Sequence, residues 1–407
     1  MPPTALGKFR ILDLSSDIAG AYCSKLFADY GADVIKIETP DTGDLTRKMA
    51  PFFKDDPHIE KSLVFFYLNC NKRSITLNLG TDEGRAVFLD LIAKSDAVIC
   101  ANPHDYLENL GLGYDRLQRA NERLVVTTIT PFGNSGPYRK YLGSDLLYYA
   151  MSGMMYTSGA YSREPLKHGH PQSYYMGGIT AAYSTLAALF SRNFTGVGQH
   201  VDLSLQECVA AHHYDSAARY SYTGTVERRS PIIESGSTKG TRFEGIVKAK
   251  DGYVSPTMQK GRPTAPFSEY ASLLGLSNPD DARFSDRQTI SEHRQELDEI
   301  VLPAIEKWPK MDYYNTFMNE GFVAGVVQTP EDLLNCPQLE ERGFYSEIHH
   351  PVMGTIKIPG EIFRLPNCPW ELRTPAPLLG QHTEEILIDL LHYPKTRYSK
   401  LLRSKVI

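Results

Sequence analysis

The first third of the chain alternates between short apolar runs and longer segments in which apolar residues recur every three or four positions. Short apolar runs typical of buried strands occupy 9–14, 33–37, 74–79, 97–100 and 124–129. Helical periodicity marks 19–30 and 81–94. Strands that alternate with helices predict βαβ units, and therefore a parallel sheet covered by helices.

The central part of the chain is mainly helical in its pattern. Residues 178–192 are apolar and rich in alanine, and a turn containing Gly196 and Gly198 follows them. We expect helix again over 203–219, and a closing helix over 383–391.

A change of composition indicates a second, smaller domain. From about residue 223 the chain becomes rich in Gly, Ser, Thr and charged residues. Further on, Asp251 and Gly252 separate two short apolar segments, which is typical of a β-hairpin. The expected boundaries are 1–222 for the first part, 223–322 for the smaller domain and 323–407 for the C-terminal part.

Composition and charge limit the classes of function. With 407 residues, 42% of them hydrophobic, the chain can bury a large core and form more than one compact unit. The formal net charge is -5 and there is no basic run, which argues against nucleic acid as a partner. No apolar stretch approaches the length that spans a bilayer, and the first residues lack the pattern of a signal peptide. We therefore expect no membrane partner and a cytoplasmic location.

The sequence contains no arrangement typical of a metal site. The six cysteines lie far apart and form no CxxC pair, so we expect reduced thiols. His168 and His170 are close together but have no carboxylate at ligand spacing. We expect no bound metal.

Four stretches in a fixed order carry a family resemblance. They are DLSSDIAGAYCSKLFADYGADVIKIETPDTGDLTR at 13–47, NCNKRSITLNL at 69–79, TPFGNSGPYRKYLGSD at 130–145 and RNFTGVGQHVDLSLQECV at 192–209. Together they resemble the class III CoA-transferases, enzymes that move coenzyme A (CoA) from an acyl-CoA thioester to a free carboxylate. The run from Asn71 to Ile75 (NKRSI) is the most specific of these signals.

The resemblance implies an architecture and a set of contacts. The family has a Rossmann-like large domain built from both chain ends, a smaller α+β domain in the middle, and two subunits interlocked as a dimer with active sites between them. Acyl-CoA and a carboxylic acid are then substrates, and no cofactor is permanently bound. The positions that the resemblance assigns to CoA contacts, here weak or vestigial, are Ala19, Gly20, Asn71, Lys72, Arg73, Asn102 and Lys140.

The catalytic aspartate of the family has no counterpart in this sequence. Transfer of CoA between carboxylates needs a carboxylate nucleophile, which becomes first an anhydride and then a thioester. Counting back from Thr195 places that position at Tyr174, or at Ser173 if the alignment slips by one. No Asp or Glu occurs between 168 and 178. We expect no catalytic residue in this chain, with Glu164 or Tyr174 as a replacement nucleophile the remaining alternative.

The CoA contacts are altered as well. Asn109 stands where the family carries an arginine, and Pro131 stands where the family favours a small residue or Lys. Lys72, Arg73 and Lys140 remain as cations for CoA phosphates, although exposed cations are often only solvated. Residues 235–240 (SGSTKG) correspond to a mobile glycine loop of the family, or form an ordinary surface loop.

These features favour a subunit without its own nucleophile. In that interpretation a homologous chain that bears the aspartate completes an interlocked hetero-oligomer. A non-enzymatic acyl-CoA-binding or regulatory protein is a second interpretation, and it predicts a stable homodimer. A third interpretation is an acyl-CoA racemase, or a transferase that acts alone. The sequence argues against this interpretation, because those relatives also use an acidic residue in the segment that corresponds to 168–178, where this chain has none.

Overall fold

The computed structural model describes residues 4–159, 163–229, 245–260 and 265–407, and these form two compact units. The large unit comprises Met1–Met154, His168–Asp215 and Glu340–Ile407, and the small unit comprises Met155–Lys167 and Ser216–Leu339. The sequence placed boundaries at 222/223 and 322/323. In the structure the chain changes units near 215 and 339, and the segment 155–167 also belongs to the small unit.

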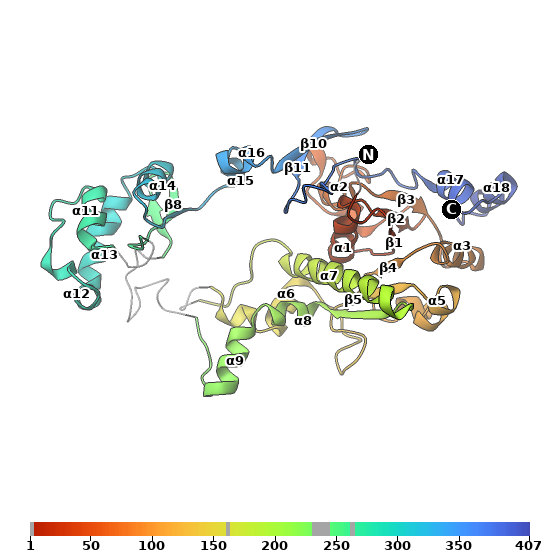
Figure 1. Cartoon of the computed structure of the whole chain (residues 1–407), viewed down its shortest axis with the longest axis horizontal. Helices are drawn as coiled ribbons and strands as arrows, with labels where there is room; N and C mark the ends of the chain where they lie inside the picture. The colour runs from red at the N-terminus through yellow and green to blue at the C-terminus, as the bar shows by residue number, and fades with distance from the viewer. Residues whose placement is uncertain (1–3, 160–162, 230–244, 261–264) are drawn as a thin grey trace. The chain divides into compact units, whose positions relative to one another are not determined.

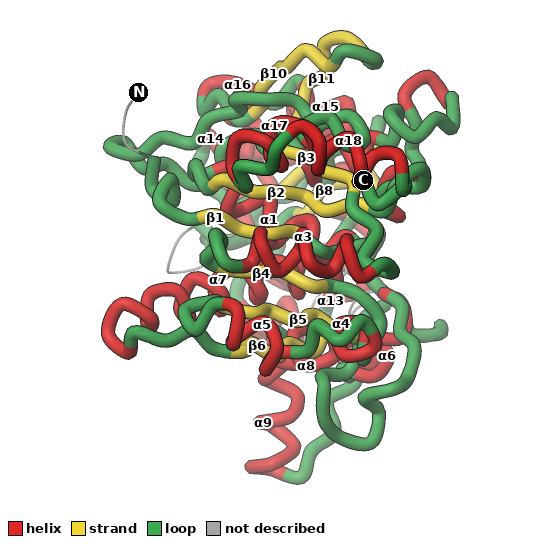
Figure 2. The backbone as a smooth tube through the Cα atoms, turned by 90° about the vertical axis from the view of Figure 1, so that its right-hand side faces the viewer, coloured by secondary structure: helices red, strands yellow, loops and turns green. Residues whose placement is uncertain are grey.

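The large unit is built on a parallel sheet of six strands in the order β3-β2-β1-β4-β5-β6 (Figures 1 and 2). The strands are β1 (Arg10–Asp13), β2 (Asp33–Glu38), β3 (Arg73–Thr76), β4 (Ala97–Cys100), β5 (Val125–Thr130) and β6 (His200–Ser204). In the centre, Leu12 pairs with Ile35 on one side and Val98 on the other. The predicted α/β class with a parallel sheet is therefore confirmed.

Helices cover both faces of this sheet. Helices α1 (Ile18–Asp29) and α7 (Gln172–Thr195) pack together on one face, and α3 (Asp82–Ile92) and α5 (Tyr114–Ala120) lie on the other (Figures 1 and 2). Glycine permits the close approach of α7 to α1, because a Cβ atom at Gly178 would lie 2.8 Å from the carbonyl oxygen of Ala19. The apolar core lies between the sheet and the α3–α5 layer.

The C-terminal segment returns to the same sheet. The backbone N–H of His382 donates to the carbonyl of Ser74 at 2.9 Å, and Ile386 and Leu387 are buried in the core beneath α3. This segment contains β10 (Tyr345–His350), β11 (Gly354–Pro359), α17 (Thr383–Glu385), η6 (Ile386–Leu390) and α18 (Lys395–Arg403). Both chain ends therefore build the large unit, as the resemblance implied.

The predicted helix over 203–219 begins later and is interrupted. Leu203 belongs to β6, where it pairs with Ile129 of β5, so sheet pairing prevails over helical periodicity at this position. The Ser204 side chain then accepts the backbone N–H of Glu207 and caps the next helix. The helices that follow are α8 (Leu205–Ala211) and α9 (Tyr214–Thr223). Most of α9 belongs to the small unit, which resumes at Ser216. The other helices of the large unit are α2 (Leu63–Asn69), α4 (Tyr106–Asn109) and α6 (Asp145–Met151).

The small unit has its own antiparallel sheet and core. Strands β7 (Val247–Ala249) and β8 (Gly252–Ser255) form the predicted hairpin, and β9 (Gly325–Val326) pairs with β8. Its helices are α11 (Phe267–Leu274), α12 (Arg287–Glu292), α13 (Arg294–Ile305), α14 (Lys310–Asn319) and α15 (Pro330–Leu334), and α16 (Pro337–Glu341) lies at its border. Within the described ranges, no helix of either unit combines the length and apolar character that a membrane crossing needs.

Candidate functional site

The sheet order changes direction between β1 and β4. The chain moves outward from β1 to β2 and β3 on one side, and from β4 to β5 and β6 on the other. In open parallel sheets, ligands bind beside such a switch point, at the carboxyl ends of the strands. A cleft of about 490 Å³ lies there in this chain. The residues that carry the argument below are Asp17, Asn102, Lys140, Tyr148 and Tyr174, all of which line it.

Asn102 joins the loops that follow β1 and β4. Its amide nitrogen donates to the carbonyl of Leu14, and its amide oxygen accepts the hydroxyl proton of Ser16 at 2.8 Å. Asn102 therefore holds the two loops together at the switch point. Among the residues that the resemblance assigned to CoA contacts, Asn102 and Lys140 are the two that line the cleft.

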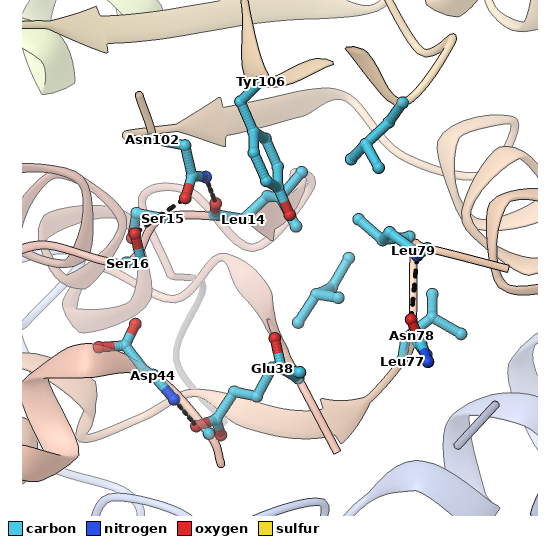
Figure 3. Close-up of a pocket in the computed structure, with 15 residues that line it drawn as sticks. Leu14, Ser15, Ser16, Glu38, Asp44, Leu77, Asn78, Leu79, Asn102 and Tyr106 are labelled. Atoms are coloured by element: carbon cyan, nitrogen blue, oxygen red, sulfur yellow. Dashed lines mark hydrogen bonds between the residues drawn. The ribbon is translucent and has the colours of Figure 1, made fainter. Parts of the chain in front are cut away.

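A smaller cavity of about 140 Å³ adjoins Asn102 (Figure 3). Glu38 and Asp44 lie on one side of it, and Asn102 and Tyr106 on the other (Figure 3). The Glu38 carboxylate is bound by the Arg47 guanidinium at 2.6 and 2.9 Å, which leaves it little capacity for a ligand. No Lys or Arg is among the described residues that line this cavity, so it does not suit a phosphate group.

Asp17 is a carboxylate in the cleft that the sequence motifs did not reveal. It precedes α1 as its N-cap and accepts the backbone N–H of Gly20 at 3.0 Å. Burial raises the pKa of Asp17 to about 7, although the bond from Gly20 favours the charged form. In the sequence, an Asp before a helical run indicates only a cap, and its place beside Tyr174 depends on how α7 packs on α1.

The predicted position of the lost nucleophile lies in the first turn of α7. Ser173 is fully buried, and its hydroxyl donates to the Asp145 carboxylate at 2.6 Å. The ring of Tyr174 packs edge-on against Tyr148 at 5.7 Å between ring centroids. Burial raises the pKa of Tyr174, so its phenol stays protonated at neutral pH. Glu164 is exposed in the small unit, where it forms an ion pair with Arg163 at 3.8 Å.

The Lys72 side chain is buried inside the fold and does not line the cleft. Its ammonium group donates to Asp13 at 2.9 Å, to the Ala21 carbonyl at 2.8 Å and to Ser24 at 2.8 Å. Burial lowers the pKa of Lys72 to about 8, although the charge of Asp13 opposes this. Asp13 also contacts Lys36 at 3.3 Å, and despite burial the two ammonium groups hold the pKa of Asp13 well below its usual value. The Lys72 ammonium group therefore donates its hydrogen bonds to buried groups of the fold.

Asn71 and Arg73 also make contacts within the fold. Asn71 has a left-handed backbone (φ 65°), and its side chain donates to Asp29 and accepts the backbone N–H of Arg373 at 2.7 Å. Arg73 pairs with Asp33 at 2.6 Å and with Glu385 at 2.7 Å. These bonds connect the NKRSI run to the C-terminal segment. Whether Asn71, Lys72 or Arg73 also meets CoA remains a prediction.

Ala19 and Gly20 form the start of α1 beside the cleft. Both are buried, and a Cβ atom at Gly20 would lie 2.7 Å from that of Ala101. Glycine therefore permits the loops after β1 and β4 to approach each other. A direct contact of these two residues with CoA also remains a prediction.

Lys140 is the cation of the cleft. Its ammonium group makes no ion pair with any described residue, and it is the one Lys or Arg among the residues that line the cleft. Two carboxylates, Asp17 and Asp105, line the same cleft, and Asp105 pairs with His104 at 2.9 Å. Pro131 also lines it, without a backbone N–H to offer. The predicted glycine loop, 235–240, lies outside the described residues.

Comparison with known proteins identifies the relatives of this chain. The profile of CoA-transferase family III matches residues 6–383. The chain is 32% identical over 405 residues to succinyl-CoA:(R)-benzylsuccinate CoA-transferase subunit BbsE of Thauera aromatica, covering 97% of this chain and 96% of that protein. It is 31% identical to succinyl-CoA–D-citramalate CoA-transferase of Chloroflexus aurantiacus, covering 100% and 99%. A CAIB/BAIF family protein of Brucella suis has a similar structure, with a TM-score of 0.83, 28% identity, and coverage of 95% and 99%.

Proposed function

The chain belongs to CoA-transferase family III, and from this premise we propose that it is a non-catalytic subunit of a heteromeric CoA-transferase. A homologous partner chain would supply the nucleophilic aspartate. The family uses CoA thioesters as substrates, so the complex would move CoA from an acyl-CoA to a free carboxylic acid. This chain would complete the interlocked assembly.

One observation carries the proposal: the first turn of α7 offers no carboxylate of its own. Ser173 is buried against Asp145, and Tyr174 has a neutral phenol. A mixed anhydride requires a carboxylate side chain, which neither residue has. The Asp145 carboxylate is itself engaged by the hydroxyl and the backbone N–H of Ser173, at 2.6 and 3.1 Å.

The surface of α7 supports a partner subunit. Large apolar side chains recur along the helix at spacings of four, three, four and four residues, which places them on one face. They are Ile179, Tyr183, Leu186, Phe190 and Phe194, all of them exposed. Phe190 is 63% exposed and Phe194 77%. Contiguous exposed apolar surface of this kind marks protein interfaces, and BbsE, the relative at 32% identity, is by its name a subunit.

Succinyl-CoA is the donor that we propose, because the names of both curated relatives include it. Benzylsuccinate is the acceptor suggested by the similarity to BbsE. The same similarity suggests a place in anaerobic toluene breakdown. The aromatic side chains of Tyr148 and Tyr174 in the cleft suit an apolar acid, although they also pack on each other.

The test is expression of the chain alone and together with a homologous chain that bears the aspartate. CoA transfer from succinyl-CoA to benzylsuccinate and to other dicarboxylates is measured in both samples. We expect the chain alone to be inactive and the complex to be active, with activity abolished by replacing the partner's aspartate. Turnover by the chain alone, or a covalent thioester mapped to one of its residues, contradicts the proposal. A stable, inactive homodimer that binds acyl-CoA favours the regulatory protein instead.

A further inference from the structure

Residues of α3, of α5 and of the turn after α4 line a hollow of about 660 Å³. The two helices lie on the same face of the sheet (Figure 2). Three arginines line it, Arg85 from α3 and Arg116 and Arg119 from α5. The turn after α4 borders the hollow at Gly111, where an added Cβ atom would meet no other atom within 4 Å. The arginines therefore surround a region that side chains do not fill.

The arginines differ in how they are held. Arg85 pairs with Asp82 and donates to the Leu79 carbonyl at 3.0 Å, so its position is set within α3. Arg116 and Arg119 are exposed and make no ion pair or hydrogen bond through their side chains with any described residue. Asp82 is the one carboxylate among the described residues that line the hollow, and it is already paired. An excess of positive charge therefore faces this space, which favours an anion.

The hollow adjoins the cleft at the switch point. Asn109 lines both of them, and Leu110 lines both the hollow and the smaller cavity. A long ligand can therefore lie in the cleft at one end and pass α4 to reach the arginines at the other. Most of the positive charge lies at the far end of this path. Among the lining residues, the cleft has one Lys or Arg, Lys140, whereas the hollow has three arginines.

We propose that Arg116 and Arg119, with Arg85 behind them, bind the phosphate of a phosphorylated ligand whose other end lies in the cleft. The inference rests on the proposed function for the identity of that ligand, a CoA thioester or CoA itself. The guanidinium fork matches phosphate oxygens with paired hydrogen bonds, and a phosphate monoester carries about -1.5 to -2 charges at pH 7. These arginines then replace, from a neighbouring helix, the cation that is absent at Asn109.

Hydrogen–deuterium exchange of the assembled complex tests this site directly, because it reports on peptides of this chain alone. CoA, dephospho-CoA and inorganic phosphate are the probes, and the peptides spanning 106–120 are followed. We expect CoA to slow exchange there, and the double variant Arg116→Gln, Arg119→Gln to raise the CoA concentration for half-protection at least tenfold. Arg403→Gln, which removes an exposed arginine from α18, is the matched control and should leave that concentration unchanged.

The probes identify the group that is bound. Weaker protection by dephospho-CoA than by CoA assigns the site to the 3′-phosphate, and equal protection assigns it to the diphosphate. Protection by inorganic phosphate alone assigns it to a free anion and overturns the link to the cleft. No protection by CoA, or equal protection in the double variant, overturns the site itself. If the complex is active but CoA does not protect the peptides spanning 106–120, this inference is refuted and the proposed function stands. If CoA protects these peptides but the complex has no transferase activity, the proposed function is refuted and the binding site stands.

Discussion

The carboxylate of Asp145 accepts two hydrogen bonds from Ser173, from its backbone N–H at 3.1 Å and from its hydroxyl at 2.6 Å. Ser173 lies in the first turn of α7, where backbone N–H groups have no partner within the helix. Asp145, which begins α6, therefore caps α7 from outside. The residue that stands at or next to the position of the family nucleophile is thus part of a structural contact.

Replacing Ser173 should show this structural role. Ser173→Ala removes one hydrogen bond to a charged group, worth about 1.5–3 kcal/mol. Ser173→Asp should destabilise the protein further, because it buries a second carboxylate against Asp145 and one of the two must then take up a proton. Urea unfolding at pH 7.5 measures both variants. An Asp variant as stable as the Ala variant would show that the two carboxylates do not meet.

Introducing a carboxylate at Tyr174 should not restore catalysis in this subunit. The new side chain would share the cleft with Asp17, and two neighbouring carboxylates do not both ionise readily. We expect Tyr174→Asp to leave the transferase rate of the complex unchanged, because the partner's aspartate would still carry out all turnover. Tyr174→Phe is the control, since it keeps the ring and removes only the hydroxyl. A second active site per complex in the Asp variant would refute the prediction.

Asp17 should make stability depend on pH. Its pKa is about 7 in the folded protein, above the ordinary value of 3.8, so between these values the folded state holds more protons than the unfolded state. Stability therefore falls as pH rises through this range, by at most about 1.4 kcal/mol per pH unit, less where water reaches the group.

The variant Asp17→Asn isolates this effect, because Asn caps a helix as well as Asp does and does not titrate. We expect the free energy of unfolding of the variant to exceed that of the wild type by an amount that grows as pH rises from 4.5 to 7 and then stays constant to pH 8. The difference between the two proteins, measured by urea unfolding at each pH, removes the contribution of every other group. A difference that is constant with pH would contradict the raised pKa.

Asp13 should have the opposite dependence on pH. Its pKa is depressed by Lys36 and Lys72, so its stabilising effect is complete above the unfolded-state value and is lost as pH falls below about 4. At pH 7, Asp13→Asn leaves two buried ammonium groups without this carboxylate and should cost about 3–5 kcal/mol. Asp56→Asn, which removes a partner of Lys61 at the surface, should change the unfolding midpoint little. Equal effects of the two variants would show that the cluster is not sealed from water.

The apolar face of α7 should control assembly. The double variant Phe190→Asp, Phe194→Asp places charges on the exposed face and should weaken association with the partner subunit at least tenfold, as measured by light scattering after size-exclusion chromatography. Thr396→Asp adds a charge at an exposed position of α18 and is the control. Unchanged assembly of the Phe variant would place the partner on another surface.

The amino-acid sequence by itself determined the fold class and the family. Alternation of apolar runs and helical periodicity reports which face of each segment is buried, and this is a local property, so five of the six parallel strands follow from it. The sixth strand lies at the edge of the sheet, with helical residues directly after it, so pairing with β5 determined its extent. The lack of an acid between 168 and 178 is likewise a property of sequence alone.

Only the tertiary structure decided which side chains meet. Asp145 and Ser173 are 28 residues apart, and the ends of Lys72 and Asp13 meet across 59 residues. Asp17 lies beside Tyr174 in the cleft because α7 packs on α1, and Arg85 shares a hollow with Arg116 because α3 lies beside α5. Such contacts depend on how loops at the carboxyl edge of the sheet dock on one another. Local periodicity carries no information about that docking, so it revealed neither the buried partners of Lys72 nor the group of three arginines.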